Sequence, residues 1–169
     1  MTMNNLLIQF IGIFAWVILI LSYWQKKKIS LLIMQIIANI LYAIHFYLLD
    51  GLAGTLCNLA GVIILILLYI KEKRNKQMYI LIPIIISLFI PIVIYSYNGL
   101  YSLLPVAASI IPLTSNWVNN MKVIKIGGIV GSICWLIYGI YTGSYASMIT
   151  EVIFIISTIL SIKKSNAKK

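Results

Sequence analysis

The segment Leu41–Asn58, with the sequence LYAIHFYLLDGLAGTLCN, ends one long apolar run, has a short polar break around Gly51 and begins the next run. A segment of the same form, CWLIYGIYTGSYASMIT, returns at Cys134–Thr150. Its Gly143 follows Gly51 by 92 residues (143 − 51). At the same spacing Asn58, the last residue of the first segment, aligns with Thr150, the last residue of the second. Ordered matches at one spacing are typical of a duplicated unit, so the sequence predicts one structural unit used twice.

An earlier pair of tripeptides fits nearly the same spacing. Ser22–Trp24 reads SYW, and Ser115–Trp117 reads SNW 93 residues later (115 − 22). The two spacings differ by one, so we expect one residue of slippage within the repeat. Gly12 and Pro105 also match at 93 (105 − 12), and we treat them as candidate hinge residues.

The composition indicates a membrane protein. Hydrophobic residues make up 62% of the 169 residues, and charged residues only 9%. A soluble domain of this length could not hide so much apolar surface. A net charge of +10 would suggest nucleic acid for a soluble protein. Here the basic residues stand in short gaps between apolar runs, so we expect a lipid bilayer as the partner and no nucleic acid.

The length of the apolar runs predicts helices. A helix needs about 20 apolar residues to cross a bilayer, whereas a barrel strand needs about ten of alternating polarity. We therefore predict an all-α membrane protein with seven transmembrane helices. The predicted spans are residues 5–24, 29–49, 52–70, 78–97, 100–116, 123–141 and 144–162. Kinks are expected at the prolines of the fourth and fifth spans, which are Pro83, Pro91, Pro105 and Pro112.

The basic residues predict the direction of each span. If the N-terminus lies outside, all 13 Lys and Arg fall on the cytoplasmic side, and the outer loops contain Asp50 and no basic residue. The C-terminus is then cytoplasmic. The first three and last three spans cross in the same directions, which predicts two parallel three-helix repeats joined by an inverter helix. The expected boundaries are 1–74 and 99–163 for the repeats, 75–98 for the inverter and 164–169 for a polar tail.

Glu151 is the only acidic residue inside a predicted span. Ionisable groups within a membrane are costly and face the bundle interior or a water-filled path. Glu151 is therefore either a solute or proton-coupling site, or a carboxyl held by a hydroxyl or backbone group that fixes helix packing. Asn58 and Thr150 occupy matching repeat positions, so they are expected to face each other and hold a polar solute beside Glu151. The alternative is a role in interhelical hydrogen bonding.

Three further polar residues lie on the second span. Gln35 and Asn39 are four residues apart and share one helix face, where they either line the inner half of a path or join helices. His45 is the only histidine and stands among aromatic residues near the outer end of the span. It is either an interfacial residue of an aromatic belt or a proton-responsive gate.

Motifs for enzymes and metals are missing from the sequence. There is no HExxH motif, no phosphate-binding glycine loop, and no Ser/His/Asp set that a single histidine could complete. The two cysteines, Cys57 and Cys134, lack metal-ligand spacing and are expected to be small buried side chains. We therefore expect no enzymatic activity, no cofactor and no metal.

The run SYWQKKKISLLIMQIIANILYAIHFYLLDGLAGTLCN and the later WLIYGIYTGSYASMITE resemble the YgjV-like proteins of the bacterial inner membrane. That resemblance covers nearly the whole chain and implies a multi-pass inner-membrane location. More distantly, the three-plus-one-plus-three plan resembles the SWEET and PQ-loop transporters. This likeness implies passage of a small solute, with an asparagine on the third helix of a repeat lining the site. Asn58 stands at that position and Thr150 where the second asparagine would be, while Trp24-Gln25 replaces the Pro-Gln pair.

Two functions from different classes follow. The first is a transporter of a small polar, sugar-like solute that uses alternating access between two three-helix bundles. The second is a membrane receptor or assembly protein that binds a ligand or partner within the same bundle, with a homo-oligomer among the expected assemblies. Fold alone does not decide between them, because one architecture hosts several functions.

Overall fold

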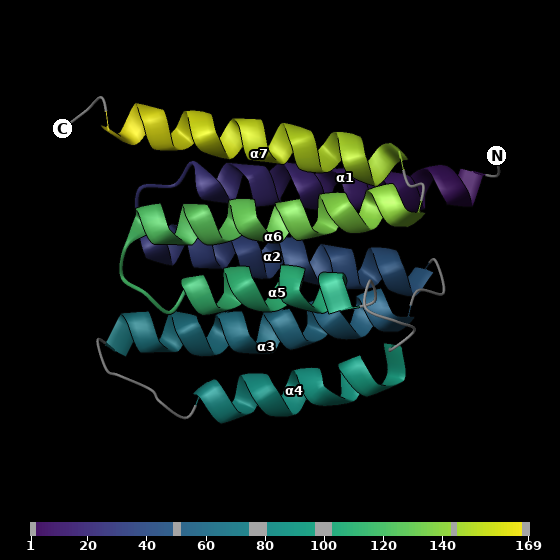
Figure 1. Cartoon of the computed structure of the whole chain (residues 1–169), viewed down its shortest axis with the longest axis horizontal. Coiled ribbons are helices and arrows are strands. Elements are labelled where there is room, and N and C mark those ends of the chain that lie inside the picture. The colour runs from purple at the N-terminus through teal and green to yellow at the C-terminus, as the bar shows by residue number, and fades with distance from the viewer. Residues whose placement is uncertain (1–2, 49–51, 75–80, 97–102, 143–144, 167–169) are drawn as a thin grey trace. The chain divides into compact units, whose positions relative to one another are not determined.

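The computed structural model describes residues 3–48, 52–74, 81–96, 103–142 and 145–166, and the regular elements in these ranges are all helices (Figure 1). The all-α prediction is therefore confirmed. The polar breaks at Asp50-Gly51 and around Gly143 lie outside the described residues. The helices are α1 (Met3–Tyr23), α2 (Lys28–Leu48), α3 (Leu52–Arg74), α4 (Leu81–Ser96), α5 (Leu104–Ser115), α6 (Met121–Thr142) and α7 (Tyr145–Asn166).

The chain divides into two compact units, Met1–Ile92 and Val93–Lys169, which we call the first and the second unit. In the first unit, α2 packs against both α1 and α3. In the second unit, α6 packs against both α5 and α7. The middle helix in chain order is thus the common packing partner in each three-helix group.

Apolar side chains fill the interior of each unit. Leu31 and Leu32 of α2 and Ile64 of α3 have no exposed surface in the first unit. In the second unit Ile124 of α6 is equally buried, and Phe154 of α7 is 4% exposed. Full burial of such a side chain contributes about 1.5–3 kcal/mol relative to exposure in water. In a membrane, close packing of side chains supplies much of this stabilisation instead, because lipid tails are as apolar as the protein interior.

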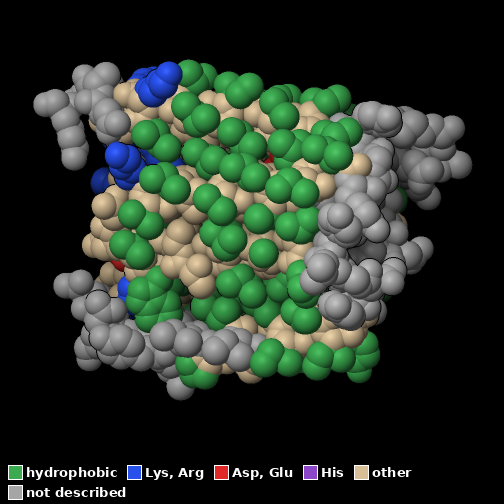
Figure 2. All heavy atoms as spheres, viewed as in Figure 1, with side chains coloured by type: hydrophobic (Ala, Val, Ile, Leu, Met, Phe, Trp, Pro, Cys, Tyr) green, Lys and Arg blue, Asp and Glu red, His purple; other side chains and the backbone are tan. Residues whose placement is uncertain are grey.

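Large hydrophobic residues also cover the outside of the helices. Phe10 is 70% exposed, Ile94 70% and Ile140 62%. Figure 2 shows hydrophobic side chains along the helices, and Lys and Arg side chains at helix ends. Two helical segments among the described residues, Lys28–His45 and Thr55–Arg74, are long and apolar enough to cross a membrane. The full set of seven crossings stays a prediction.

The turn after α1 and the turn after α5 are built in the same way. Both helices close with tight hydrogen bonds that reach back three residues, as helix ends often do. The amide of Trp24 donates to the Leu21 carbonyl oxygen at 3.2 Å, and Trp117 donates to Thr114 at 3.0 Å. Each pair is shifted from the other by 93 positions.

The serine of each tripeptide adds a second shared feature. The Ser22 hydroxyl donates to the Leu19 carbonyl oxygen at 2.6 Å. The Ser115 hydroxyl donates to the Pro112 carbonyl oxygen at 2.8 Å, again 93 positions later. The 93-residue spacing in the sequence therefore coincides with a recurring hydrogen-bond pattern in the structure.

Helix α2 and its counterpart α6 also pack in the same register, each against the last helix of its three-helix group. Lys28 pairs with Glu72 across α2 and α3. A shift of 93 takes these positions to 121 and 165. The contact observed nearby, between Lys125 and Ser161, lies four residues further along α6 and four residues back along α7. Four residues are about one helical turn, so the two antiparallel pairs have the same alignment.

Candidate functional site

Two of the predicted polar residues face the interior of the first unit. Gln35 is 3% exposed. The side-chain amide of Asn39 donates to the Gln35 backbone carbonyl at 2.8 Å. Its amide oxygen lies against Gly61 of α3, where a Cβ atom would come within 2.6 Å of it. Gly61 therefore makes room for an amide between α2 and α3. This is the geometry of a packing contact, and a role in lining a path stays a prediction.

His45 joins α1 and α2. Its Nδ1 lies 2.8 Å from the carbonyl oxygen of Ile8. A carbonyl oxygen only accepts, so Nδ1 carries the hydrogen in this contact. A Cβ atom at Gly12 would lie 2.8 Å from Cε1 of the ring. Gly12 thus provides the space for the imidazole, while its role as a hinge and that of His45 as a gate remain predictions.

A polar line runs between α6 and α7 in the second unit. The Ser132 hydroxyl is the side-chain hydrogen-bond partner of Glu151, and Ser132 is 6% exposed. Nearer the start of α6, the Lys125 ammonium donates to the Ser161 hydroxyl at 2.8 Å and to its carbonyl oxygen at 3.4 Å. We call these four residues the polar seam.

The spacing within the polar seam places a cation and a carboxyl at two depths of one interface. Lys125 and Ser132 are seven residues apart, so they lie on the same face of α6, separated by about 10 Å along the helix. Lys125 is 5% exposed and Ser161 4%. Sequence reasoning missed this cation as a site residue because it counted Lys125 as a cytoplasmic charge. Only the pairing register of α6 and α7 shows that it is buried.

The remaining predicted site residues fall in separate units. Asn58 is half-buried in the first unit, and Thr150 is half-buried in the second. Whether Asn58 shares a site with Thr150 and Glu151 stays a prediction. Pro105 lies in the first turn of α5, where a proline fits without a kink. Its carbonyl oxygen accepts from the Ser109 hydroxyl at 2.9 Å.

The structure shows no group of three or more His, Cys, Asp or Glu side chains that could hold a metal ion among the residues it describes. Cys57 and Cys134 are half-buried free thiols. The described interior offers hydrogen-bonding and charged groups. The first unit has amides, an imidazole and the Lys28–Glu72 ion pair, and the second has a carboxyl, an ammonium and hydroxyls.

Comparison with known proteins identifies the family. No curated protein and no solved structure matches the chain. A family model described as a bacterial inner membrane protein, Imp-YgjV, matches residues 6–169. This confirms the YgjV-like resemblance and the inner-membrane class, while the more distant SWEET resemblance stays a prediction. Because the match extends from the first turns of α1 past the end of α7, the chain belongs to the Imp-YgjV family of bacterial inner membrane proteins.

Proposed function

We propose that this inner membrane protein transports a small polar solute by alternating access between its two three-helix units. The observation that carries the proposal is the 93-residue recurrence, which relates both local hydrogen bonds and helix register. The Ser22 and Ser115 bonds illustrate it. Parallel repeats of this kind form one class of transporter architecture, in which the substrate site lies where the repeats meet, near the middle of the membrane.

The proposed membrane topology has seven crossings, with the N-terminus outside and the C-terminus in the cytoplasm. It is supported by the placement of all 13 Lys and Arg on one side. In this arrangement α4 acts as the inverter that lets the two groups of three helices run in the same direction. Lys28 and Glu72 of the first unit, which pair at 3.0 Å, then mark its cytoplasmic end.

The proposed substrate contacts are Asn58, Thr150 and Glu151, because they are polar groups within apolar helices. Such groups are expensive in a membrane unless they serve packing or function. We further propose that Gln35 and Asn39 line the inner half of the solute path. The Ser132 hydroxyl beside Glu151 positions the carboxyl, which is a suitable group to couple solute movement to a proton.

Uptake into proteoliposomes tests this function. Labelled sugars, amino acids and vitamins are offered to the purified chain with an imposed proton gradient. Accumulation of at least one solute class supports transport. Tight binding of one ligand without uptake of any solute would instead support the receptor function. No binding and no uptake across the panel would contradict both.

Glu151→Gln then separates a coupling role from a packing role. The substitution keeps the shape and hydrogen bonding of the side chain and removes its charge. We expect normal insertion and loss of the pH dependence of uptake between about pH 5 and 8. Ser132→Ala is the matched variant, because it removes the neighbouring hydroxyl and keeps the carboxyl, so its uptake should still depend on pH. If Glu151→Gln leaves the pH profile unchanged, the carboxyl serves packing alone.

A further inference from the structure

The last turn of α3 contains four charged residues in a row, Lys71 to Arg74, and the structure gives them different surroundings. Lys71 is 8% exposed. The Glu72 carboxylate accepts from the Lys28 ammonium of α2 at 3.0 Å, and these two side chains are 20% and 6% exposed. The one acid of the run is therefore engaged inside the first unit. Lys73 and Arg74 are exposed.

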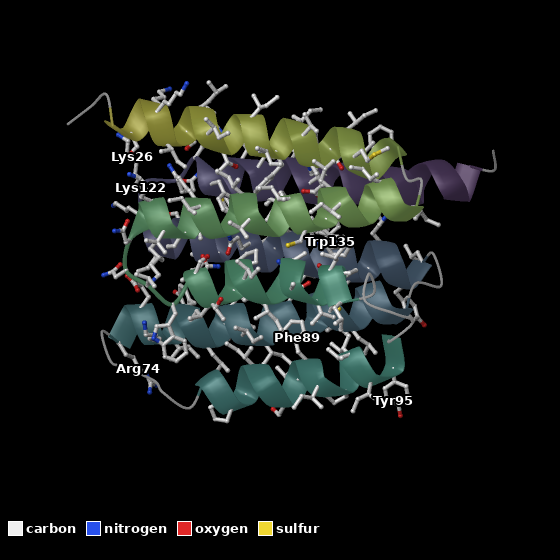
Figure 3. All side chains as sticks on the ribbon, viewed as in Figure 1. Lys26, Arg74, Phe89, Tyr95, Lys122 and Trp135 are labelled. Atoms are coloured by element: carbon white, nitrogen blue, oxygen red, sulfur yellow. The ribbon has the colours of Figure 1, made fainter. Side chains whose placement is uncertain are left out.

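Lys73 and Arg74 line a pocket at this end of α3 together with Tyr69 and Ile70. Its volume is about 450 Å³. Figure 3 shows Arg74 at the end of the α3 ribbon. Among the described residues, the pocket lining thus has two cations, one phenol and one apolar side chain, and the carboxylate of the charged run, Glu72, is already paired with Lys28. A pocket of this charge favours an anion.

We propose that this pocket binds the phosphate head group of an anionic phospholipid. An arginine guanidinium and a lysine ammonium are the side chains that best bind phosphate oxygens. Tyrosine is enriched at the level of lipid head groups, because its ring is apolar and its hydroxyl is wet. Ile70 offers an apolar surface to the first carbons of an acyl chain. Basic pockets on the cytoplasmic side of membrane helices suit such lipids.

The apolar half of the pocket decides between a lipid and a free phosphate. Inorganic phosphate would use Lys73 and Arg74 but would leave Ile70 and the Tyr69 ring in contact with water. A phospholipid covers all four residues at once. The position of the pocket also fits, since its lining residues form the last turns of Thr55–Arg74, one of the two segments apolar enough to cross a membrane. This site is independent of whether the protein transports a solute.

Native mass spectrometry of the full-length chain in detergent tests the proposal. Phosphatidylglycerol is titrated into delipidated protein, and phosphatidylcholine is titrated in parallel. We expect the first phosphatidylglycerol to bind at least about tenfold more tightly than phosphatidylcholine. In the double variant Lys73→Gln/Arg74→Gln this preference should fall by at least about tenfold, since two basic groups at about 1 kcal/mol each exceed the roughly 1.4 kcal/mol that corresponds to a factor of ten.

A charge-matched control variant distinguishes a built site from diffuse attraction. Lys26→Gln/Lys27→Gln removes the same charge from exposed side chains at the same end of the first unit, where Lys26 is labelled in Figure 3. It should keep the lipid preference of the parent chain. Equal losses in the two double variants, or no loss in Lys73→Gln/Arg74→Gln, would overturn the proposal. Displacement of the lipid by millimolar inorganic phosphate would identify a free phosphate as the ligand and overturn it as well.

Discussion

The contact between His45 and Gly12 shows how a single side chain sets the distance between two helices. The imidazole lies where any larger residue at position 12 would place its Cβ, and its Nδ1 donates to a backbone carbonyl of the facing helix at 2.8 Å. That carbonyl, at Ile8, is on the preceding turn of α1. His45 thus makes both a close contact with Gly12 and a hydrogen bond to α1. A substitution at position 12 or 45 should therefore disturb the packing of α1 against α2.

Gly12→Ala should destabilise the chain by about 1–2 kcal/mol. The new Cβ would lie 2.8 Å from Cε1 of His45 and 2.9 Å from Nδ1, so the ring must move and its bond to Ile8 weakens. The gain in helix propensity, about 1 kcal/mol at most, offsets only part of this cost. Reversible unfolding in mixed micelles measures the difference.

His45→Ala provides the control for that prediction. In a chain without the imidazole, the new Cβ of Gly12→Ala meets no ring. The destabilisation caused by Gly12→Ala should then disappear or become a small stabilisation. The double-mutant cycle isolates the contact itself. Equal effects of Gly12→Ala with and without His45 would show that the glycine is needed for another reason, such as bending of α1.

The sequence shows which residues are unusual, but it does not show which residues they contact. The unusual polar residues inside apolar runs, such as Glu151 and His45, are visible from composition alone. Their partners are not, because Ser132 and Gly12 are common residues whose importance depends on helix register. The same holds for Lys125, whose burial follows from the position of Ser161 on α7.

At the scale of helices, two glycines of α6 allow α5 and α6 to approach closely. A Cβ atom at Gly131 would lie 2.9 Å from the backbone oxygen of Ala108 and 2.6 Å from Cγ of Pro112. At Gly127 it would collide with the Ser115 side chain. The two glycines are four residues apart, so they lie on one face of α6 and leave it without side chains there. Small residues often occupy such positions between membrane helices.

Gly131→Ala should destabilise the second unit by about 2 kcal/mol. Its neighbour is a backbone oxygen, which cannot turn aside as a side chain can, so α5 as a whole must shift. The neighbouring Val130→Ala is the matched control, because Val130 is 39% exposed and its loss should cost little. Unfolding of both variants in mixed micelles tests this. Equal stability of Gly131→Ala and the parent chain would contradict the packing.

Some predicted helix starts can be compared with the structure where it describes the residues. The expected span 29–49 begins within one residue of α2, because the Lys26–Lys28 run marks the end of an apolar stretch. The expected span 100–116 contains all of α5, which runs from Leu104 to Ser115, and the first three residues of the span lie outside the described residues. Pro105 explains the start, since proline favours the first turn of a helix and lacks the amide hydrogen needed further in.

For the molecule as a whole, orientation in the membrane is the most direct prediction to test. A protease-sensitive tag at the C-terminus should be protected in intact spheroplasts, and an Asp50→Cys variant should react with an impermeant thiol reagent. The labelling uses a chain with Cys57→Ser and Cys134→Ser. A tag digested from outside, or a residue 50 that reacts only after lysis, would contradict the seven-crossing topology.

The two-unit organisation was partly visible in the sequence. Spacings of 92 and 93 were found from short matches, and the structure places recurring hydrogen bonds at 93. The family match confirms the membrane class that composition predicts. How the units cooperate was beyond sequence reasoning, because matched positions such as Asn58 and Thr150 identify equivalence in the chain and do not measure proximity in space.

The packing order within each unit also bears on how the chain is made. The principal contacts join helices that follow each other, α1 with α2 and α2 with α3, then α5 with α6 and α6 with α7. When α2, α3, α6 and α7 leave the ribosome, one packing partner of each has therefore already been synthesised, and the few residues between neighbouring helices keep the entropy cost of closing each hairpin small. At about 5–20 residues per second, all three helices of the first unit are synthesised before α5 begins. Assembly is thereby paced by translation, and exposed polar groups such as Asn39 are covered as the next helix arrives.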